Sequence, residues 1–217
     1  MIDGVDVIVG AEAVCLTARR ELRVISSAFA GGGLATARTI VNLHVPKNFA
    51  CADAGATVLD FARRRGLPAP YVGMLTSAWT EKAQTAVATA GDVRALVVAT
   101  IGLSNASAAG LSARAAALAG TINTVVVVDA DPEPAAMVNL VMTVTEVKTA
   151  LLLDAGLKSL DGHPASGTST DAVVVAATGR GPRCAFGGPI SDLGWAVARA
   201  ARDALGTGVR RWLEDHR

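Results

Sequence analysis

Short apolar runs separated by glycine turns constrain the fold of this 217-residue chain more than any other feature. Their apolar residues predict strands at residues 5–9, 14–17, 22–28, 39–45, 71–76, 93–101, 121–129 and 172–177. Gly31-Gly32-Gly33 and Gly91-Asp92 separate neighbouring runs, which is typical of β-hairpins. The alanine-rich run 83–89 before Gly91 fits either a strand or a helix. Hairpin signals therefore outnumber strand–helix–strand units.

Four other segments carry helix signals. They are residues 57–65, 111–118, 134–153 and 191–205. Gly206 separates the last of them from an amphipathic turn that ends at Trp212. The helix 134–153 lies between the strands 121–129 and 172–177, which predicts one crossover joining two parallel strands.

The combined pattern predicts a single α+β domain over residues 1–217, in which helices cover a mixed sheet that contains several hairpins. A doubly wound α/β sheet is the alternative. Aromatic residues make up only 4% of the chain, whereas hydrophobic residues make up 51%. We therefore expect the core to consist mainly of Val, Leu, Ile and Ala.

Charge and hydropathy exclude several classes of partner. The formal net charge is +1, from 20 basic and 19 acidic residues, which argues against nucleic acid or an anionic membrane as a partner. The long apolar segment 134–153 contains Glu146 and Lys148, so it does not predict a membrane span. The N-terminus lacks the basic start and apolar stretch of a signal peptide. We expect a soluble, cytoplasmic protein, and the sequence leaves open a homo-oligomer.

Cysteine and histidine spacing predicts no metal site. The three cysteines, Cys15, Cys51 and Cys184, are widely separated, and we expect each to be a small buried hydrophobic residue. The histidines do not form a zinc-binding motif. His163 is expected in an exposed loop. The chain also lacks a phosphate-binding loop and a nucleophile elbow.

Four polar stretches lie at or beyond the ends of apolar runs. They are Gly102-Leu103-Ser104-Asn105-Ala106, Gly120-Thr121-Ile122-Asn123, Thr145-Glu146-Val147-Lys148 and Ser166-Gly167-Thr168-Ser169-Thr170-Asp171. Glycine lets the backbone approach a ligand closely, and Ser, Thr and Asn offer neutral hydrogen bonds. These stretches suit a large polar organic substrate better than a metal ion.

Each stretch also has an ordinary structural interpretation. Ser104 and Asn105 either face a substrate or cap a helix. Thr121 and Asn123 share one strand face, which favours either a polar cleft wall or a strand end bonded to a neighbouring loop. Trp79 offers a flat face for a ring system, although a single Trp is more often part of a core.

The charged residues of the last two stretches are candidates for acid–base chemistry. Glu146 and Lys148 lie about 200° apart around a helix, so their side chains leave from opposite sides. Glu146 belongs either to a desolvated stripe suited to a general base or to a solvent-facing one. Asp171 either orients a reacting group or bonds loop amides.

Taken in order along the chain, these motifs resemble one family, the adenosylcobinamide amidohydrolases. The motifs are Ser26-Ser27-Ala28, Gly31-Gly32-Gly33, Asn42-Leu43-His44-Val45, Gly73-Met74-Leu75-Thr76, Ser104-Asn105-Ala106, Gly120-Thr121-Ile122-Asn123, Thr145-Glu146-Val147-Lys148 and Gly167-Thr168-Ser169-Thr170-Asp171. The resemblance covers about residues 25–205 but is poor over 46–56. It implies hydrolysis of the amide that joins aminopropanol to the corrin side chain of adenosylcobinamide. The products are adenosylcobyric acid and aminopropanol, and the reaction serves corrinoid salvage without a cofactor, since the corrinoid is the substrate.

Within that reaction we assign roles as hypotheses. Glu146 or Asp171 activates water, and Lys148 neutralises a carboxylate or donates to the leaving group. The residues expected to bind the substrate are Asn42, Trp79, Ser104, Asn105, Thr121, Asn123, Thr168 and Thr170. The alternatives are an acyl-enzyme formed on Thr121 or Ser104, a corrinoid-binding module without catalysis, and an amidase for another cofactor precursor.

Overall fold

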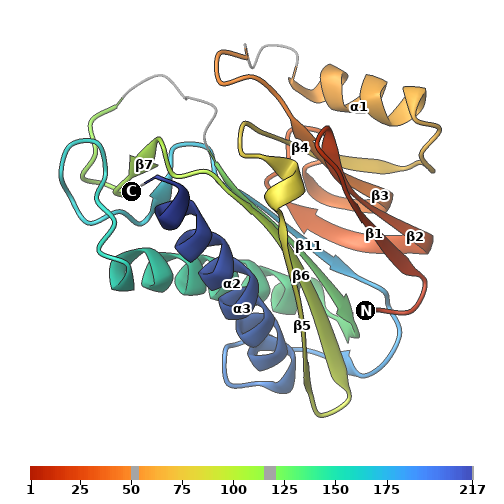
Figure 1. Ribbon diagram of the computed structural model, residues 1–217. Helices are drawn as coiled ribbons and strands as arrows, with labels where there is room; N and C mark the ends of the chain where they lie inside the picture. The colour runs from red at the N-terminus through yellow and green to blue at the C-terminus, as the bar shows by residue number, and fades with distance from the viewer. Residues whose placement is uncertain (50–53, 115–120, 217) are drawn as a thin grey trace.

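The fold comes from a computed structural model that describes residues 1–49, 54–114 and 121–216 (Figure 1). Its main strands are β1 (Val5–Val9), β2 (Ala13–Ser26), β3 (Gly33–His44), β4 (Tyr71–Thr76), β5 (Gln84–Ala90), β6 (Val93–Ile101), β8 (Ile122–Asp129) and β11 (Ala172–Ala177). Short pairs are formed by β7 (Ala106–Ser107) with β10 (Gly167–Thr168), and by β9 (Asp131–Pro132) with β12 (Arg183–Cys184). The helices are α1 (Ala54–Arg64), α2 (Pro134–Asp154) and α3 (Asp192–Asp215), with a 3₁₀ turn, η2, at Thr80–Lys82.

The eight main strands form one mixed sheet in the order β4-β3-β2-β11-β8-β6-β5, with β1 paired to β2. Within the described residues, β3 with β4 and β8 with β11 are its parallel pairs, and the other neighbours are antiparallel. The predicted hairpins are present, and the β8–α2–β11 crossover is parallel as expected. The α+β class with a mixed sheet is confirmed, and the doubly wound alternative does not describe this sheet.

The sheet folds back on itself, so that its two halves pack face to face. Side chains of β3 and β4, including Ile40 and Met74, belong to the same buried cluster as Leu96, Val98 and Val125 of β6 and β8. Helix α1 covers the outer face of the first half, and α2 with α3 covers the outer face of the second (Figure 1). The result is four layers, helix–sheet–sheet–helices, with three apolar interfaces.

Helix α3 differs from its predicted form. It is one continuous helix that passes through Gly206, where the sequence predicted a break. Gly206 and Gly208 are both buried, and a Cβ at Gly208 would collide with Ile101 at the end of β6. These glycines therefore bring the helix close to the sheet, a packing role that a local glycine rule does not reveal. Ser191 is its N-cap, since Ser191 Oγ accepts a hydrogen bond from Gly194 N.

Two further predictions, of two separate strands and of one helix, differ from the structure. The expected strands 14–17 and 22–28 are one strand, β2, with an irregularity in its pairing to β3 between Thr17 and Leu22. The expected helix 111–118 is not helical at residues 111–114, and its remainder lies outside the described residues. Helix α2 is long and apolar enough by composition to cross a bilayer, but here it packs against β11 and α3.

Candidate active site

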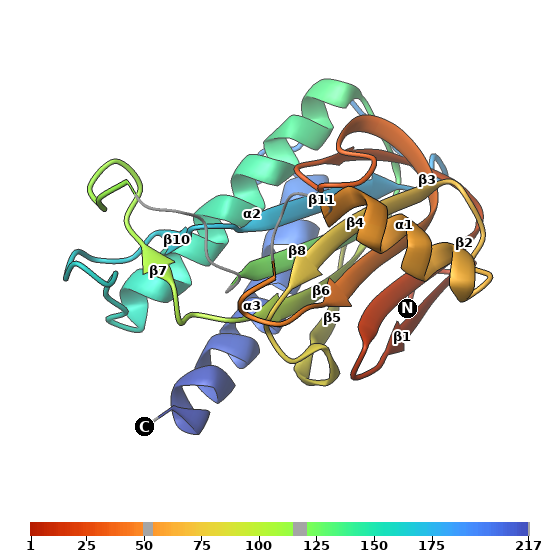
Figure 2. The same ribbon diagram turned by 90° about the horizontal axis from the view of Figure 1, so that it is seen from above.

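The polar stretches of the sequence meet at one edge of the folded sheet. Strands β3, β4 and β6 end there, and β8 and β11 begin there: His44 pairs with Thr76, and Ile101 pairs with Ile122. The short β7–β10 pair lies beyond the same edge (Figure 2). Segments that are up to about 130 residues apart in sequence, from Asn42 to Asp171, thus come together.

A buried polar network closes the space between the two halves of the sheet at this edge. Asn42 Nδ2 donates to Thr100 Oγ1 at 2.9 Å, and Asn123 Nδ2 donates to Asn42 Oδ1 at 2.8 Å. Asn123 Nδ2 also reaches the Leu75 carbonyl, and Thr121 Oγ1 lies 3.1 Å from Asn123 Oδ1. Each of these side chains is at most 3% exposed. The predicted residues Asn42, Thr121 and Asn123 therefore lie together, behind the surface.

Asp171 is the centre of a second buried cluster. It forms an ion pair with Lys148, and its carboxylate also accepts hydrogen bonds from Ile122 N, from Thr168 N and from Thr168 Oγ1. The side chains of Asp171 and Lys148 are only 12% and 13% exposed. Four donors occupy the acceptor positions of this carboxylate, so water has no vacant oxygen lone pair to approach. The arrangement joins α2, the start of β8 and the loop before β11.

Gly167 makes this ion pair possible. A Cβ at this position would lie 2.5 Å from Asp171 Oδ2 and 2.7 Å from Lys148 Nζ, which is closer than atoms in contact allow. The same segment reaches the loop after β6, because Gly167 pairs with Ser107 and Asn105 Nδ2 donates to Ser169 Oγ at 2.7 Å. The Thr170 carbonyl accepts from Thr121 Oγ1 at 2.7 Å. The two buried clusters are thus directly connected.

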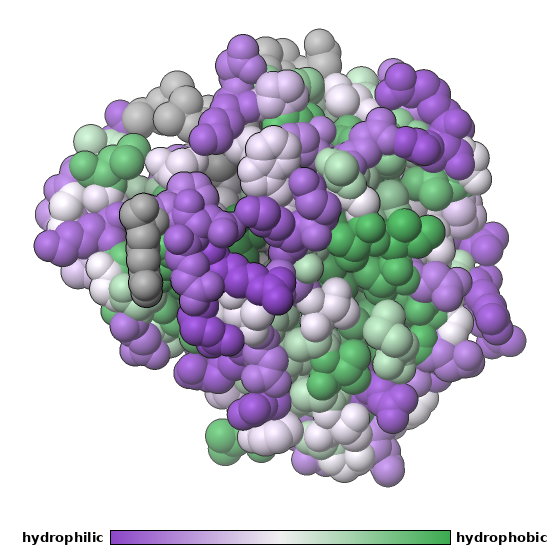
Figure 3. Space-filling view, in the orientation of Figure 1, coloured by the Kyte–Doolittle hydropathy of each residue, from purple (hydrophilic) through white to green (hydrophobic). Residues whose placement is uncertain are grey.

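A cleft of about 290 Å³ opens beside this edge. It is lined by the loop after β4 (Ser77–Trp79), by Gly102 and Ser104 after β6, and by the C-terminal turns of α3. Lys82 pairs with Asp215 at 2.7 Å across its rim, which lowers the pKa of Asp215. On the face seen in Figure 3, hydrophilic residues gather near the C-terminus, and hydrophobic residues gather on the right side of the view. Of the predicted binding residues, Trp79 and Ser104 line this cleft.

His44 stands next to the cleft, and the sequence reasoning did not select it as a site residue. Its Nδ1 lies 3.0 Å from the carbonyl oxygen of Ala78, and its ring stacks on Trp79 with centroids 5.2 Å apart. A carbonyl only accepts hydrogen bonds, so Nδ1 carries a proton, and in the neutral form of the ring Nε2 is then the acceptor. The position of His44 in the sequence could have indicated a role in the site. It lies two residues after Asn42 in one strand, so the two side chains leave from the same face.

Glu146 is not brought into either cluster. It lies on an exposed part of α2, and no ion pair or hydrogen bond joins its side chain to the described residues. Val147, the next residue, is buried, and Lys148 points to Asp171. Glu146 and Lys148 thus leave α2 on different sides, as expected. Lys148 joins the cluster around Asp171, and Glu146 lies away from both buried clusters.

The described cysteines have packing roles. Cys15 packs at the α1 face, and its burial raises the pKa of the thiol to about 11. Cys184 packs against the α2–α3 layer, and burial, assisted by Asp131, raises the pKa of its thiol. A thiol with a raised pKa is a poor nucleophile near neutral pH. Cys51 lies outside the described residues, and within those residues no cluster of three metal-ligating side chains is found.

Two sequence comparisons with known proteins agree with the motif pattern. The family model described as adenosylcobinamide amidohydrolase matches residues 2–217. An adenosylcobinamide amidohydrolase from Methanosarcina mazei is 32% identical over 145 residues, which are 67% of this chain and 64% of that protein. The PH0078 protein of Pyrococcus horikoshii OT3 aligns with 97% of this chain and 80% of its own, at 12% identity and a TM-score of 0.46. The chain therefore belongs to the adenosylcobinamide amidohydrolase family.

Proposed function

We propose that this protein hydrolyses the amide between the corrin side chain and aminopropanol of adenosylcobinamide. The products are adenosylcobyric acid and aminopropanol, and the reaction returns a scavenged corrinoid to cobamide synthesis. Family membership and the name of the Methanosarcina relative support the substrate. The structural observation that carries the proposal is the convergence of five strand ends beside a cleft whose neighbour is a histidine with a fixed tautomer.

The size of the cleft fits the part of the substrate that reacts. A volume of about 290 Å³ holds a short amide arm with its aminopropanol group, but not a corrin macrocycle. The macrocycle therefore lies over the mouth of the cleft, where Trp79, 60% exposed, offers a flat apolar face. The neutral groups of Ser77 and Ser104 suit the amide-bearing rim of a corrinoid.

His44 is the group best placed to move protons. Nε2 accepts a proton from water, whose oxygen attacks the amide carbon and forms a tetrahedral intermediate. The resulting imidazolium then gives that proton to the nitrogen of aminopropanol as the carbon–nitrogen bond breaks. Ser104, which lines the cleft, is placed to donate a hydrogen bond to the amide oxygen. The reaction transfers the acyl group from nitrogen to water without a change of oxidation state, so the proposal assigns it no cofactor.

The carboxylates take different roles in this proposal. Asp171, with Lys148, positions the loop before β11 and the start of β8, because its acceptor sites are occupied by protein donors. Asn42, Asn123, Thr121, Asn105, Thr168 and Thr170 support the walls of the cleft from behind. Glu146 remains the second candidate for a base, and Glu146→Gln in the assay below decides its part.

The remaining expectations extend the proposal to the cell. We place the reaction in the cytoplasm, with the corrinoid as a small-molecule substrate and with neither nucleic acid nor a membrane as a partner. The close balance of charge supports the absence of a nucleic-acid partner.

The test is a product assay on the full chain. Adenosylcobinamide, cobinamide without its adenosyl group and a simple aliphatic amide are incubated separately, and free aminopropanol is quantified by mass spectrometry. We expect release from adenosylcobinamide and none from the simple amide. Tight corrinoid binding without release of aminopropanol over a long incubation would instead identify a binding module and refute the proposal.

A further inference from the structure

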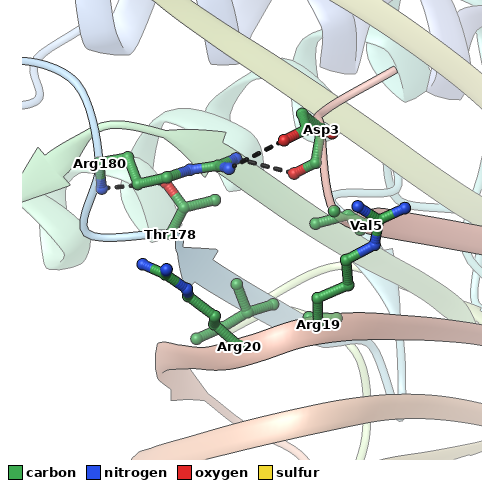
Figure 4. Close-up of a pocket in the computed structure, with 9 residues that line it drawn as sticks. Asp3, Val5, Arg19, Arg20, Thr178 and Arg180 are labelled. Carbon is green, nitrogen blue, oxygen red and sulfur yellow. Dashed lines mark hydrogen bonds and ion pairs between the residues drawn. The ribbon is translucent and has the colours of Figure 1, made fainter.

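A second pocket lies at the opposite edge of the sheet from the cleft. It has a volume of about 360 Å³ and is formed by the β1–β2 hairpin and by the segment after β11 (Figure 4). Its polar lining consists of Asp3, Arg19, Arg20, Thr178 and Arg180. We call it the arginine pocket. None of its lining residues belongs to the cleft or to the two buried polar clusters.

The irregularity in β2 is the reason that two consecutive arginines line the pocket. In a regular strand, consecutive side chains point to opposite faces. The pairing of β2 with β3 shifts between Thr17 and Leu22, and Arg19 and Arg20 fall inside this shift. Such irregularities re-aim side chains. The backbone of Arg19 is fixed by its N–H, which donates to the Gly4 carbonyl at 2.9 Å.

The three arginines of the pocket differ in whether a carboxylate neutralises their charge. Arg180 has two carboxylate partners, Asp3 and Asp129, at 3.4 and 2.9 Å. In the part of the chain that the structure describes, no carboxylate pairs with Arg19 or Arg20. The lining therefore keeps two unmatched positive charges in one concave place on a chain whose formal net charge is only +1. A concave surface focuses such a charge on an anion.

The floor of the pocket has a different chemistry. Val5, Ala18 and Leu22 line it, and each is at most 5% exposed. The volume exceeds that of an inorganic anion and falls in the range of small-molecule sites. A ligand that fits both the apolar floor and the charged rim has two features. It has a small apolar group that packs on the floor, and a compact double negative charge that pairs with guanidinium groups.

We propose that the arginine pocket binds the phosphate monoester of a small organic molecule. A phosphate monoester carries nearly two negative charges at neutral pH, and arginine pairs with its oxygens through paired N–H donors. Arg19 and Arg20 supply these donors from β2, where their side chains extend to different sides of the pocket, and Arg180, held by Asp3 and Asp129, lies across the pocket from β2 (Figure 4). The site is separate from the proposed reaction and independent of it.

Isothermal titration calorimetry on the full chain tests this proposal with four probes at constant ionic strength. The probes are phenyl phosphate, inorganic phosphate, benzoate and phenol. We expect phenyl phosphate to bind one-to-one with a Kd below about 1 mM. Inorganic phosphate, which lacks the apolar group, and benzoate, which has one negative charge, should each bind several-fold more weakly. Phenol, which has no charge, should not bind measurably.

The double variant Arg19→Gln/Arg20→Gln should weaken phenyl phosphate binding at least tenfold. The matched control is Arg63→Gln/Arg64→Gln, which removes the same charge from a hollow on α1 where Asp60 already pairs with Arg63. The control should leave the affinity unchanged. Equal weakening by both variants, unchanged binding in the first, or benzoate as tight as phenyl phosphate would overturn the proposal. The single variants decide if the double variant does not fold.

Discussion

The layer between the two halves of the sheet has two ends of opposite character. Along most of its length it is apolar: Leu96, Val98, Val125 and Val127 pack in one cluster with Ile40 and Val72. At the edge beside the cleft, the same layer ends in Asn42, Thr100 and Asn123, which bond one another across the two halves. The same strands thus supply both an apolar core and the buried polar network beside the cleft.

This difference separates stability from positioning. Apolar burial stabilises without direction, at about 25 cal/mol per Å². Buried amides cost free energy unless each is bonded, and their bonds have fixed geometry. The amide end therefore adds little net stability, but it fixes how β3 and β6 end relative to β8. His44 is the last residue of β3, and Ser104 lies in the loop that follows β6, so the amide network determines where the chemistry of the cleft lies.

The largest effect should come from His44→Asn. Removal of a positioned general base costs about 10²–10⁴-fold in rate, so we expect kcat to fall by this factor. Measured aminopropanol release at one constant, near-neutral pH checks this loss.

The matched control for that variant is His163→Asn. His163 lies in the loop before β10, where its backbone, rather than its ring, bonds Ser159. Its replacement should leave kcat within about twofold. If His44→Asn keeps the wild-type rate while it remains folded, His44 is not the base and Glu146 becomes the leading candidate.

The sequence predicts the apolar end well and the polar end only in part. Val93–Ile101 and Tyr71–Thr76 were predicted with the bounds that the structure has, because their apolar runs end at clear turns. The apolar run of β8 is also typical of a strand that is covered on both faces, and it is so covered, since Val126 faces the helices and Val125 faces the other half of the sheet. Periodicity did not reveal that the cover on that second face is the same sheet folded back, because folding back is a tertiary arrangement.

The candidate site is likewise predicted only in part. The sequence reveals the polar stretches, because Gly, Thr and Asn interrupt apolar runs. Their partners are not: Asn42 and Asn123 are 81 residues apart, and nothing local links them. His44 lies in one of the motifs of the resemblance, but the sequence does not show its partners, and its importance follows from the Ala78 carbonyl and from Trp79.

Asp171→Asn should give the next largest effect, on stability. Removal of one partner from a buried ion pair costs about 3–5 kcal/mol, because the other charge stays buried alone. Here Lys148 would lose its carboxylate, and an amide nitrogen would face donors such as Ile122 N. Urea unfolding measures the loss. Asp60→Asn, which breaks the exposed pair with Arg63 at 3.6 Å, is the control and should change stability by less than about 1 kcal/mol. Similar losses in the two variants would show that Asp171 is not a structural anchor.

The smallest of these effects, and the most direct test of the two ends, comes from comparing Asn42→Ala with Leu96→Ala. The Asn42 variant removes the donor to Thr100 Oγ1 and leaves Asn123 Nδ2 with the Leu75 carbonyl alone, which costs about 1–3 kcal/mol. The Leu96 variant leaves a cavity in the apolar part of the layer, which costs about 2–5 kcal/mol.

Activity should reverse this order. Leu96→Ala, assayed well below its unfolding temperature, should keep kcat, because a cavity in the apolar part of the layer does not turn the ends of β3 and β6. Asn42→Ala should lose about tenfold in kcat, the equivalent of about 1.4 kcal/mol in the barrier, because His44 two residues later is no longer held in place. Equal kcat values for the two variants would mean that the buried amides only fill space, and that the cleft is positioned by the loops alone.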